Sequence, residues 1–504
     1  MTNYGAATAS SSTDETSTPT FSSSKKTPGW IEAIAPFVAE FVGTCLVVFT
    51  MGCAHFTGDK AWNPTAVACI LTVAMYSFGP ISGAHLNPAI TLGMAFSFKF
   101  PWSKVVGRVV AQVAGAFCGG LAYWAIFATF ALPVPKPELG IYIDIGIVET
   151  LYTFMMAFVF LNCISSVRNN REGDQNHFFA IAVGFVYIAG GYAAQDISGG
   201  IFNPAASLAI GMTAGMPVAA AIYCGWQIFG CWLASVAFAI VRPEDFKQQY
   251  NGRLEDFEPL ARSKLAGELI GTFVIVMTVG LNAVMKCSAG PWSSAAAYIS
   301  MIYSLGDVSG GHFNPAVTLA AVMTRRDVCS FGLGQIYVVK QLLGGALAGL
   351  VYAHFVSEKQ GADPDSLTPR AGFSFTQVCF AELFFTSLFA FVYLAVSTST
   401  MAPSLTKTNF YFAFAIGSCM TIGGFSVGAI SGGALNPAVA VGTLVAEIRS
   451  LGSSIFDGKN LARALHLLWY VLYELGGGAL GACVYALTHQ KEYLKDGTNY
   501  PHLP

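Results

Sequence analysis

The chain has 504 residues, of which 54% are hydrophobic and only 11% are charged, and its formal net charge at pH 7 is −2. Soluble proteins carry about a quarter of charged residues, so this composition excludes soluble domains and predicts a protein that crosses a membrane many times. The net charge near zero argues against nucleic acid as a partner.

Apolar segments long enough to cross a bilayer fall into two groups of six. Residues 1–28 are rich in Ser and Thr and lack an apolar core, which predicts a disordered tail and not a signal peptide. A first unit then covers 29–241, a polar linker 242–262, a second unit 263–487, and a tail 488–504. The expected crossings are 31–54, 63–80, 105–131, 140–165, 178–195 and 217–241, then 263–286, 292–308, 332–356, 374–398, 408–428 and 463–487.

A ten-residue motif occurs four times between these segments, as SGAHLNPAIT at 82–91, SGGIFNPAAS at 198–207, SGGHFNPAVT at 309–318 and SGGALNPAVA at 431–440. Asn caps the free N–H groups of a helix, and Pro suits the first helical position. Each box therefore predicts a helix start, and the apolar run after it is half a crossing long. Asn63-Pro64 lacks the Ser-Gly lead-in and is expected to begin an ordinary membrane helix. The box residues are Asn87, Pro88, Ala89, Asn203, Pro204, Ala205, Asn314, Pro315, Ala316, Asn436, Pro437 and Ala438.

A glutamate inside an apolar segment precedes each box. These residues are Glu40, Glu149, Glu268 and Glu382, and they precede the box asparagines by 47, 54, 46 and 54 residues. The alternation predicts a tandem duplication of a unit that is itself duplicated. A carboxylate near the middle of a membrane costs about 2.5–3.5 kcal/mol on insertion scales. We therefore expect each glutamate to hold the N–H groups of a box loop, the alternative being a protonated glutamate at a helix interface. Loop-bracing roles are also expected for Gln112, Gln341, His85 and His312.

The placement of Lys and Arg predicts that both termini and the linker are cytoplasmic. Three crossings separate the glutamates within a unit, so the two halves of a unit are inverted, and their half-helices enter the membrane from opposite faces. The N-terminal ends then meet near the midplane with partial positive charge. Their loops must line a wet cavity or be buried in protein. Such a tube carries small neutral molecules and repels cations.

Residues 31–487 resemble two fused members of the aquaporin, or major intrinsic protein, family. The resemblance rests on the four boxes, their Ser-Gly lead-ins, the glutamate helices and the six crossings per unit. It implies an all-α membrane protein with two barrels, each of six transmembrane helices and two re-entrant half-helices. It also implies passive diffusion of water or small uncharged solutes, and no cofactor. From the residues themselves we expect no metal site and no catalysis. Family members place four barrels around a central axis, so a homodimer of this chain would form a pseudo-tetramer in the lipid bilayer.

The constriction departs from the family pattern. An arginine normally follows the second box of a unit, and this chain has Ala206 and Val439 there. Ungapped offsets place the other constriction positions at Val67, Gly191 and Gly200 in the first unit, and at Ser294, Gly424 and Gly433 in the second. Without the guanidinium donors we expect a wider, more apolar constriction that rejects large solutes and cations less well. The large side chains of Tyr192, Phe202 or Phe425 would narrow the constriction again if they filled this space.

Other functions remain open on the sequence. A secondary transporter also has inverted repeats with broken helices at the midplane. A non-conducting scaffold, or a chain in which one barrel conducts, would account for the loss of both arginines. The polar stretch 449–463 has no counterpart in the first unit and is a candidate cap over the second pore. The eight histidines are scattered, and we expect no enzyme.

Overall fold

The computed structural model describes residues 28–57, 61–129, 141–171, 174–246, 258–326, 328–358, 367–399, 411–452, 454 and 457–493. The expected N-terminal tail up to residue 27, the linker residues 247–257 and the C-terminal residues 494–504 lie outside these ranges.

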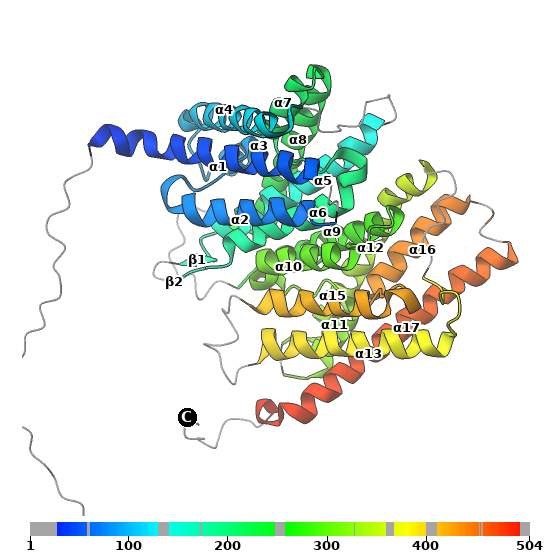
Figure 1. Cartoon of the computed structure of the whole chain (residues 1–504). Coiled ribbons are helices and arrows are strands. Elements are labelled where there is room, and N and C mark those ends of the chain that lie inside the picture. The colour runs from blue at the N-terminus through cyan, green and yellow to red at the C-terminus, as the bar shows by residue number, and fades with distance from the viewer. Residues whose placement is uncertain are drawn as a thin grey trace, which may run out of the picture.

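The described residues form twelve long helices that lie side by side, with four short helices between them (Figure 1). The first unit has long helices α1 (Gly29–Thr57), α2 (Asn63–Ser82), α4 (Trp102–Phe127), α5 (Ile141–Phe160), α6 (Phe179–Ser198) and α8 (Pro217–Val241), and half-helices α3 (Pro88–Phe96) and α7 (Pro204–Thr213). The π-turn η1 (Leu161–Ser165), the ribbon of β1 (Asn170–Arg171) and β2 (Asp174–Gln175), and η2 (Pro243–Phe246) complete it.

The second unit repeats this order. Its long helices are α9 (Ala261–Val284), α10 (Gly290–Ser309), α12 (Phe331–Glu358), α13 (Phe375–Tyr393), α15 (Phe412–Ser431) and α17 (Gly458–Thr488), and its half-helices are α11 (Pro315–Met323) and α16 (Pro437–Leu451). The short turns are η4 (Leu394–Thr398) and η6 (Gln490–Tyr493). The predicted architecture of two barrels with twelve crossings and four half-helices is confirmed.

The fourth half-helix is longer than the others. It has 15 residues, against 9 in α3, 10 in α7 and 9 in α11. The polar stretch that begins at Arg449 therefore starts inside α16 and lengthens it. Residues 453, 455 and 456 lie outside the described ranges, and a cap over the second pore stays a prediction.

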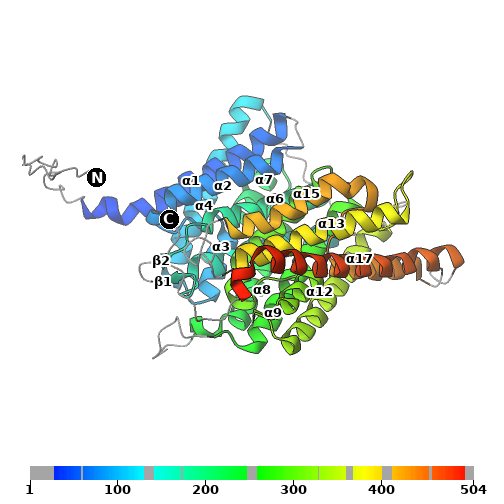
Figure 2. The ribbon, with the colours of Figure 1, turned by 90° about the horizontal axis from the view of Figure 1, so that it is seen from below.

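The helix α10 differs in composition from the other long helices. Eleven helices of the described chain are apolar and long enough to cross a membrane, and α10, with five serines, is not among them. Its serines face protein: Ser293 Oγ donates to the carbonyl of Ala189 at 2.8 Å, and Ser300 Oγ to that of Ala182 at 2.9 Å. Both carbonyls belong to α6 of the first unit. Small residues and serine hydrogen bonds thus join the two units. Figures 1 and 2 show the helices of the two units lying against each other.

A buried ion pair fastens the end of the first unit to the second. Arg242 follows α8, is fully buried, and binds both carboxylate oxygens of Asp307 on α10 at 2.6 and 2.7 Å. Its other donors reach Asn162 Oδ1 and the carbonyl of Ser304, each at 2.9 Å. Removing one member of such a pair is costly because polar groups stay buried without their partner.

Replacing this arginine tests the junction. We expect Arg242→Ala to lower the free energy of unfolding by about 3 kcal/mol, measured by thermal unfolding in detergent micelles, and Arg242→Lys to recover part of the loss. Lys264→Ala is the control, since the Lys264–Glu258 pair leaves the glutamate side chain 85% exposed, and its loss should cost less than about 1 kcal/mol. Equal effects of the two alanine variants would contradict the buried role.

Candidate functional site

Each box asparagine caps its own half-helix. Its Oδ1 accepts the N–H of the alanine two residues later, at 2.9 Å for Asn87, 3.0 Å for Asn203, 2.8 Å for Asn314 and 3.0 Å for Asn436. The residue before each asparagine has a positive φ, between 48° and 54°, at Leu86, Phe202, Phe313 and Leu435. This conformation is strained for a residue with a side chain, so the surrounding structure must hold each loop in place.

The two boxes of a unit are joined through their asparagines. Asn87 Nδ2 donates to the carbonyl of Phe202 at 2.9 Å, and Asn203 Nδ2 to that of Leu86 at 2.9 Å. The second unit repeats the exchange: Asn314 Nδ2 reaches the carbonyl of Leu435 at 2.9 Å, and Asn436 Nδ2 that of Phe313 at 3.0 Å. The N-terminal ends of the paired half-helices therefore meet inside each barrel.

The buried glutamates hold the loops. Glu40 accepts the N–H groups of His85 at 3.0 Å and Leu86 at 2.7 Å, and the hydroxyl of Ser82 at 2.7 Å. Each of the other three glutamates likewise accepts two consecutive backbone N–H groups and one serine hydroxyl. For Glu149 these belong to Ile201, Phe202 and Ser198. For Glu268 they belong to His312, Phe313 and Ser309, and for Glu382 to Ala434, Leu435 and Ser431. A carboxylate that accepts consecutive backbone N–H groups offsets their lost hydration and fixes the strained turn.

A glutamine supports three of these four glutamates. Gln112 donates to Glu40 at 2.8 Å, Gln341 to Glu268 at 2.7 Å, and Gln227 to Glu149 at 2.8 Å. The sequence analysis missed Gln227, and it assigned the other two to the loops, whereas they bind the glutamates and the threonines Thr91 and Thr318.

The fourth glutamate, Glu382, has Glu474 beside it in place of a glutamine. Gln227 and Glu474 are equivalent in the repeats, because each lies three residues before a glycine that packs on a glutamate-bearing helix. These glycines are Gly230, against α5, and Gly477, against α13. Glu474 is fully buried, its Oε1 accepts the N–H of Asn436 at 3.0 Å, and its Oε2 has no hydrogen-bond partner among the described residues. Glu382 and Glu474 thus accept adjacent N–H groups of one loop. Two buried carboxyls this near to each other cannot both be ionised at low cost.

The box histidines contact side chains. His85 Nδ1 lies 3.1 Å from Thr91 Oγ1, and His312 Nδ1 lies 3.0 Å from Thr318 Oγ1. Each threonine hydroxyl also reaches the carbonyl of its box asparagine at 3.2 Å. The rings therefore support the boxes through threonine.

The carbonyls of the lead-in serines each have a donor that the sequence analysis missed. Arg108 Nη1 donates to the carbonyl of Ser82 at 2.7 Å and to Glu40 at 2.8 Å. In the other three boxes a tyrosine hydroxyl takes this place at 2.7–2.9 Å, from Tyr223, Tyr337 and Tyr470 to Ser198, Ser309 and Ser431.

The predicted constriction glycines lie against each other in pairs. A Cβ on Gly200 would stand 3.3 Å from Cα of Gly191, and a Cβ on Gly433 would stand 3.1 Å from Cα of Gly424. Positions Gly191 and Gly424 also face prolines at the start of the neighbouring helix: their Cβ atoms would come within 2.7 and 2.6 Å of Cβ of Pro64 and Pro291. These two glycines allow close helix packing, because the space for a side chain is already filled.

The remaining constriction positions differ between the units. Val67 and Ala206 are buried, at 5% and 0% exposure. Ser294 accepts a hydrogen bond from Asn282 of α9 at 3.4 Å. Of the bulky residues considered above, Tyr192 is tied to the carbonyl of Ala61 at 2.5 Å. Phe425 is 56% exposed on α15.

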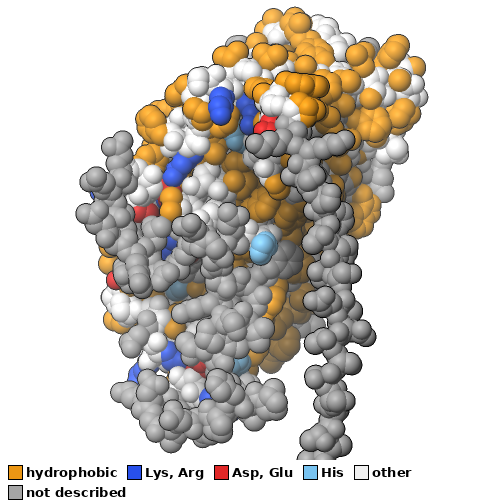
Figure 3. All heavy atoms as spheres, turned by 90° about the vertical axis from the view of Figure 1, so that its left-hand side faces the viewer, with side chains coloured by type: hydrophobic (Ala, Val, Ile, Leu, Met, Phe, Trp, Pro, Cys, Tyr) orange, Lys and Arg blue, Asp and Glu red, His pale blue; other side chains and the backbone are white. Residues whose placement is uncertain are grey.

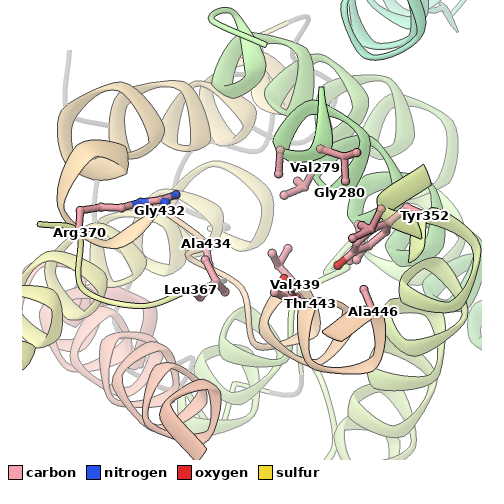
Figure 4. A pocket seen from close by; sticks show the side chains of 14 residues that line it. Val279, Gly280, Tyr352, Leu367, Arg370, Gly432, Ala434, Val439, Thr443 and Ala446 are labelled. Carbon is pink, nitrogen blue, oxygen red and sulfur yellow. Dashed lines mark hydrogen bonds between the residues drawn. The ribbon is translucent and has the colours of Figure 1, made fainter. Parts of the chain in front are cut away.

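A cavity lies beside the fourth box. The space that water-sized molecules can occupy in it is about 70 Å³, and its lining includes Val439, Gly432 and Ala434 (Figure 4). Most of the other lining residues are apolar side chains of α9, α12 and α16. Val439, which takes the place of the family's arginine, is among the lining residues, and its side chain is only 2% exposed.

Exchanging Glu474 and Gln227 tests the support of the boxes. We expect Glu474→Gln to raise the free energy of unfolding by about 1–2 kcal/mol, because the amide can donate to Glu382 while its oxygen still accepts from Asn436. The reverse change Gln227→Glu should lower it by a similar amount. Thermal unfolding in detergent at several pH values measures both, and a destabilised Glu474→Gln would contradict this account.

A family model and several known proteins are similar to this chain. The model of the major intrinsic protein family matches residues 30–135, 141–290 and 281–485. Aquaporin NIP1-3 from Oryza sativa subsp. japonica is 30% identical over 217 residues, which cover 41% of this chain and 74% of that protein. Aquaporin-B from Dictyostelium discoideum is 30% identical over 249 residues, 43% of this chain and 79% of that protein.

Two further similarities come from a bacterial relative and a solved structure. Glycerol uptake facilitator protein-like 6 from Lactiplantibacillus plantarum is 30% identical over 187 residues, 36% of this chain and 84% of that protein. The X-ray structure of the aquaglyceroporin from Plasmodium falciparum is 20% identical, with a TM-score of 0.36 over 45% of this chain and 95% of that one. The family match spans both units, and the chain belongs to the major intrinsic protein family, which includes the aquaporins.

Proposed function

We propose that the chain is a membrane channel with two pores, one in each barrel, for passive diffusion of water or small uncharged solutes. The observation that carries this proposal is the reciprocal exchange between box asparagines, made at 2.9 Å in both directions in the first unit. It brings two positive helix ends together in a membrane-spanning barrel, where they favour acceptor oxygens and disfavour cations.

The box amides retain hydrogen-bonding capacity for a solute. An asparagine side chain has two N–H donors, and the exchange between boxes uses one of them. In the second unit the other N–H of Asn314 and of Asn436 can face a water or a small solute that passes between them. These amide donors are uncharged, and they can bind a neutral solute by hydrogen bonds alone.

We propose an orientation in the membrane from the basic residues at one end of the two barrels. Lys99 pairs with Asp245 at 2.7 Å, and at the corresponding place in the second unit Arg326 pairs with Glu492 at 3.0 Å. Figure 3 views the end at which the first and last described residues lie, and Lys and Arg side chains are visible on it. Basic residues mark the cytoplasmic side, so we place both termini there.

Pairwise substitution of the box asparagines tests conduction. Serine can replace asparagine as a helix cap but supplies no amide donor, so we expect Asn87→Ser with Asn203→Ser to abolish flux through the first pore, and Asn314→Ser with Asn436→Ser through the second. Stopped-flow light scattering of proteoliposomes under sucrose and urea gradients would then show each pair losing roughly half of the flux.

Asn63 provides a matched control for this test, since it precedes a proline at the start of α2 but lies outside the boxes. Asn63→Ser should leave flux unchanged. Wild-type flux no faster than that of empty liposomes would contradict the channel and favour a structural role.

We also propose that two chains form a ring of four barrels. Within one chain, Ser300 on α10 contacts Ala182 on α6. The same positions in the repeats are Val73 on α2 and Ala415 on α15. Val73 is 58% exposed, so this half of the interface is open to a second copy. Two copies related by a two-fold axis would close both open faces at once.

Cysteine cross-linking tests the ring. We expect Val73→Cys combined with Ala415→Cys to give a disulfide-linked dimer in membranes treated with an oxidant, visible on non-reducing gels. Val106→Cys is the control, because Val106 is 72% exposed on α4 but is not part of the repeated interface. A monomer band alone from the double variant would contradict this arrangement.

A further inference from the structure

Arg370 is the one charged side chain among the fourteen residues that line the cavity of the second unit. It belongs to the segment 367–374 that leads into α13, and Figure 4 shows its guanidinium pointing toward Gly432 in the lead-in of the fourth box. The residues around the space are mainly valine, alanine and leucine, with Tyr352 and Thr443 as the polar side chains. A positive charge in this lining raises the free energy of a cation in the cavity, although solvent screens part of the charge because the arginine is only half-buried.

The backbone holds this segment against the box loop. The N–H of Arg370 donates to the carbonyl of Ile430, at the end of α15, at 3.1 Å, and the N–H of Phe373 returns to the carbonyl of Arg370 at 3.0 Å. Leu367 is only 6% exposed, and a Cβ on Gly432 would stand 2.8 Å from its Cδ2. Gly432 also has a φ of 94°. A side chain at position 432 would have to adopt a rare backbone conformation and displace the end of Leu367. The backbone hydrogen bond from Arg370 to Ile430 keeps Arg370 next to the box loop.

We propose that Arg370 sets the charge selectivity of the second pore. This inference rests on the proposed function, since it requires the second barrel to conduct. The guanidinium repels cations at the entrance to the fourth box and offers planar N–H donors to a neutral solute with a carbonyl oxygen, such as urea. It reaches the cavity from the segment before α13, whereas the half-helix residue Val439 supplies no charge.

The two pores then differ in selectivity. By the offset of 233 residues that relates the later halves of the units, Arg370 corresponds in sequence to Pro137. The structural setting of Pro137 lies outside the described residues. The proposal therefore concerns the second pore, whose described residues include this arginine.

The experiment measures proton and neutral-solute flux in the same vesicles. Full-length protein is reconstituted into liposomes that contain a pH-sensitive dye, and water, urea and proton flux are recorded for wild type, Arg370→Ala, Arg370→Gln and Arg370→Lys. We expect proton flux to rise about tenfold in the alanine and glutamine variants, which corresponds to a barrier lower by about 1.4 kcal/mol, while water flux persists. Lysine keeps the charge and should keep the low proton flux.

Arg449→Ala is the matched control, because Arg449 is an exposed arginine near the end of α16 that does not line the cavity. It should behave as wild type. Arg370→Ala and Arg370→Gln proteins that pass water at the wild-type rate, yet leak protons no faster, would overturn the inference and leave the channel function intact. A wild-type protein that passes neither water nor urea would overturn the proposed function, and this inference with it.

Discussion

The buried carboxylate that accepts consecutive backbone N–H groups is the interaction on which each quarter of this protein depends. A membrane interior offers no water to the peptide groups of a loop, so an irregular segment can cross it only if protein atoms satisfy those groups. Glu40, Glu149, Glu268 and Glu382 do this for the four box loops. The loops in turn place the half-helices, and the half-helices place the asparagines.

The cost of burying four carboxylates is offset locally. Each binds two N–H groups and a serine hydroxyl, and a side-chain amide completes the shell of three of them. The fourth shell is different: Glu474 stands where an amide stands elsewhere, and Ala440 stands where Ser207 binds Gln227. The same quarter has the longest half-helix and the cavity with Arg370. The last quarter of the chain therefore departs from the other three in the support of its glutamate, in the length of its half-helix and in its cavity.

The junction between the units uses the same physics as the packing within them. Serines of α10 donate to carbonyls of α6, and Arg242 forms a buried bidentate pair with Asp307. The serines lower the hydropathy of α10, which therefore looks less like a membrane helix than its neighbours do. Its faces are covered by protein, so it has little need of apolar side chains.

The sequence alone determined the fold class, the twelve crossings, the four half-helices and the asparagines at their starts. These features follow from local chemistry. A long apolar run is stable inside a bilayer, and an Asn-Pro pair favours the start of a helix. The bracing glutamates could also be predicted, since a lone charge in an apolar run demands a partner. Only the tertiary structure showed what depends on distant residues: Gln227 and Glu474 as the equivalent supports, the prolines that fill the space beside Gly191 and Gly424, and the place of Arg370. An insertion after the fourth box breaks the constant offset that would otherwise align Glu474 with Gln227. No spacing rule predicts which loop brings a guanidinium to a cavity, because that depends on how segments far apart in the chain pack together.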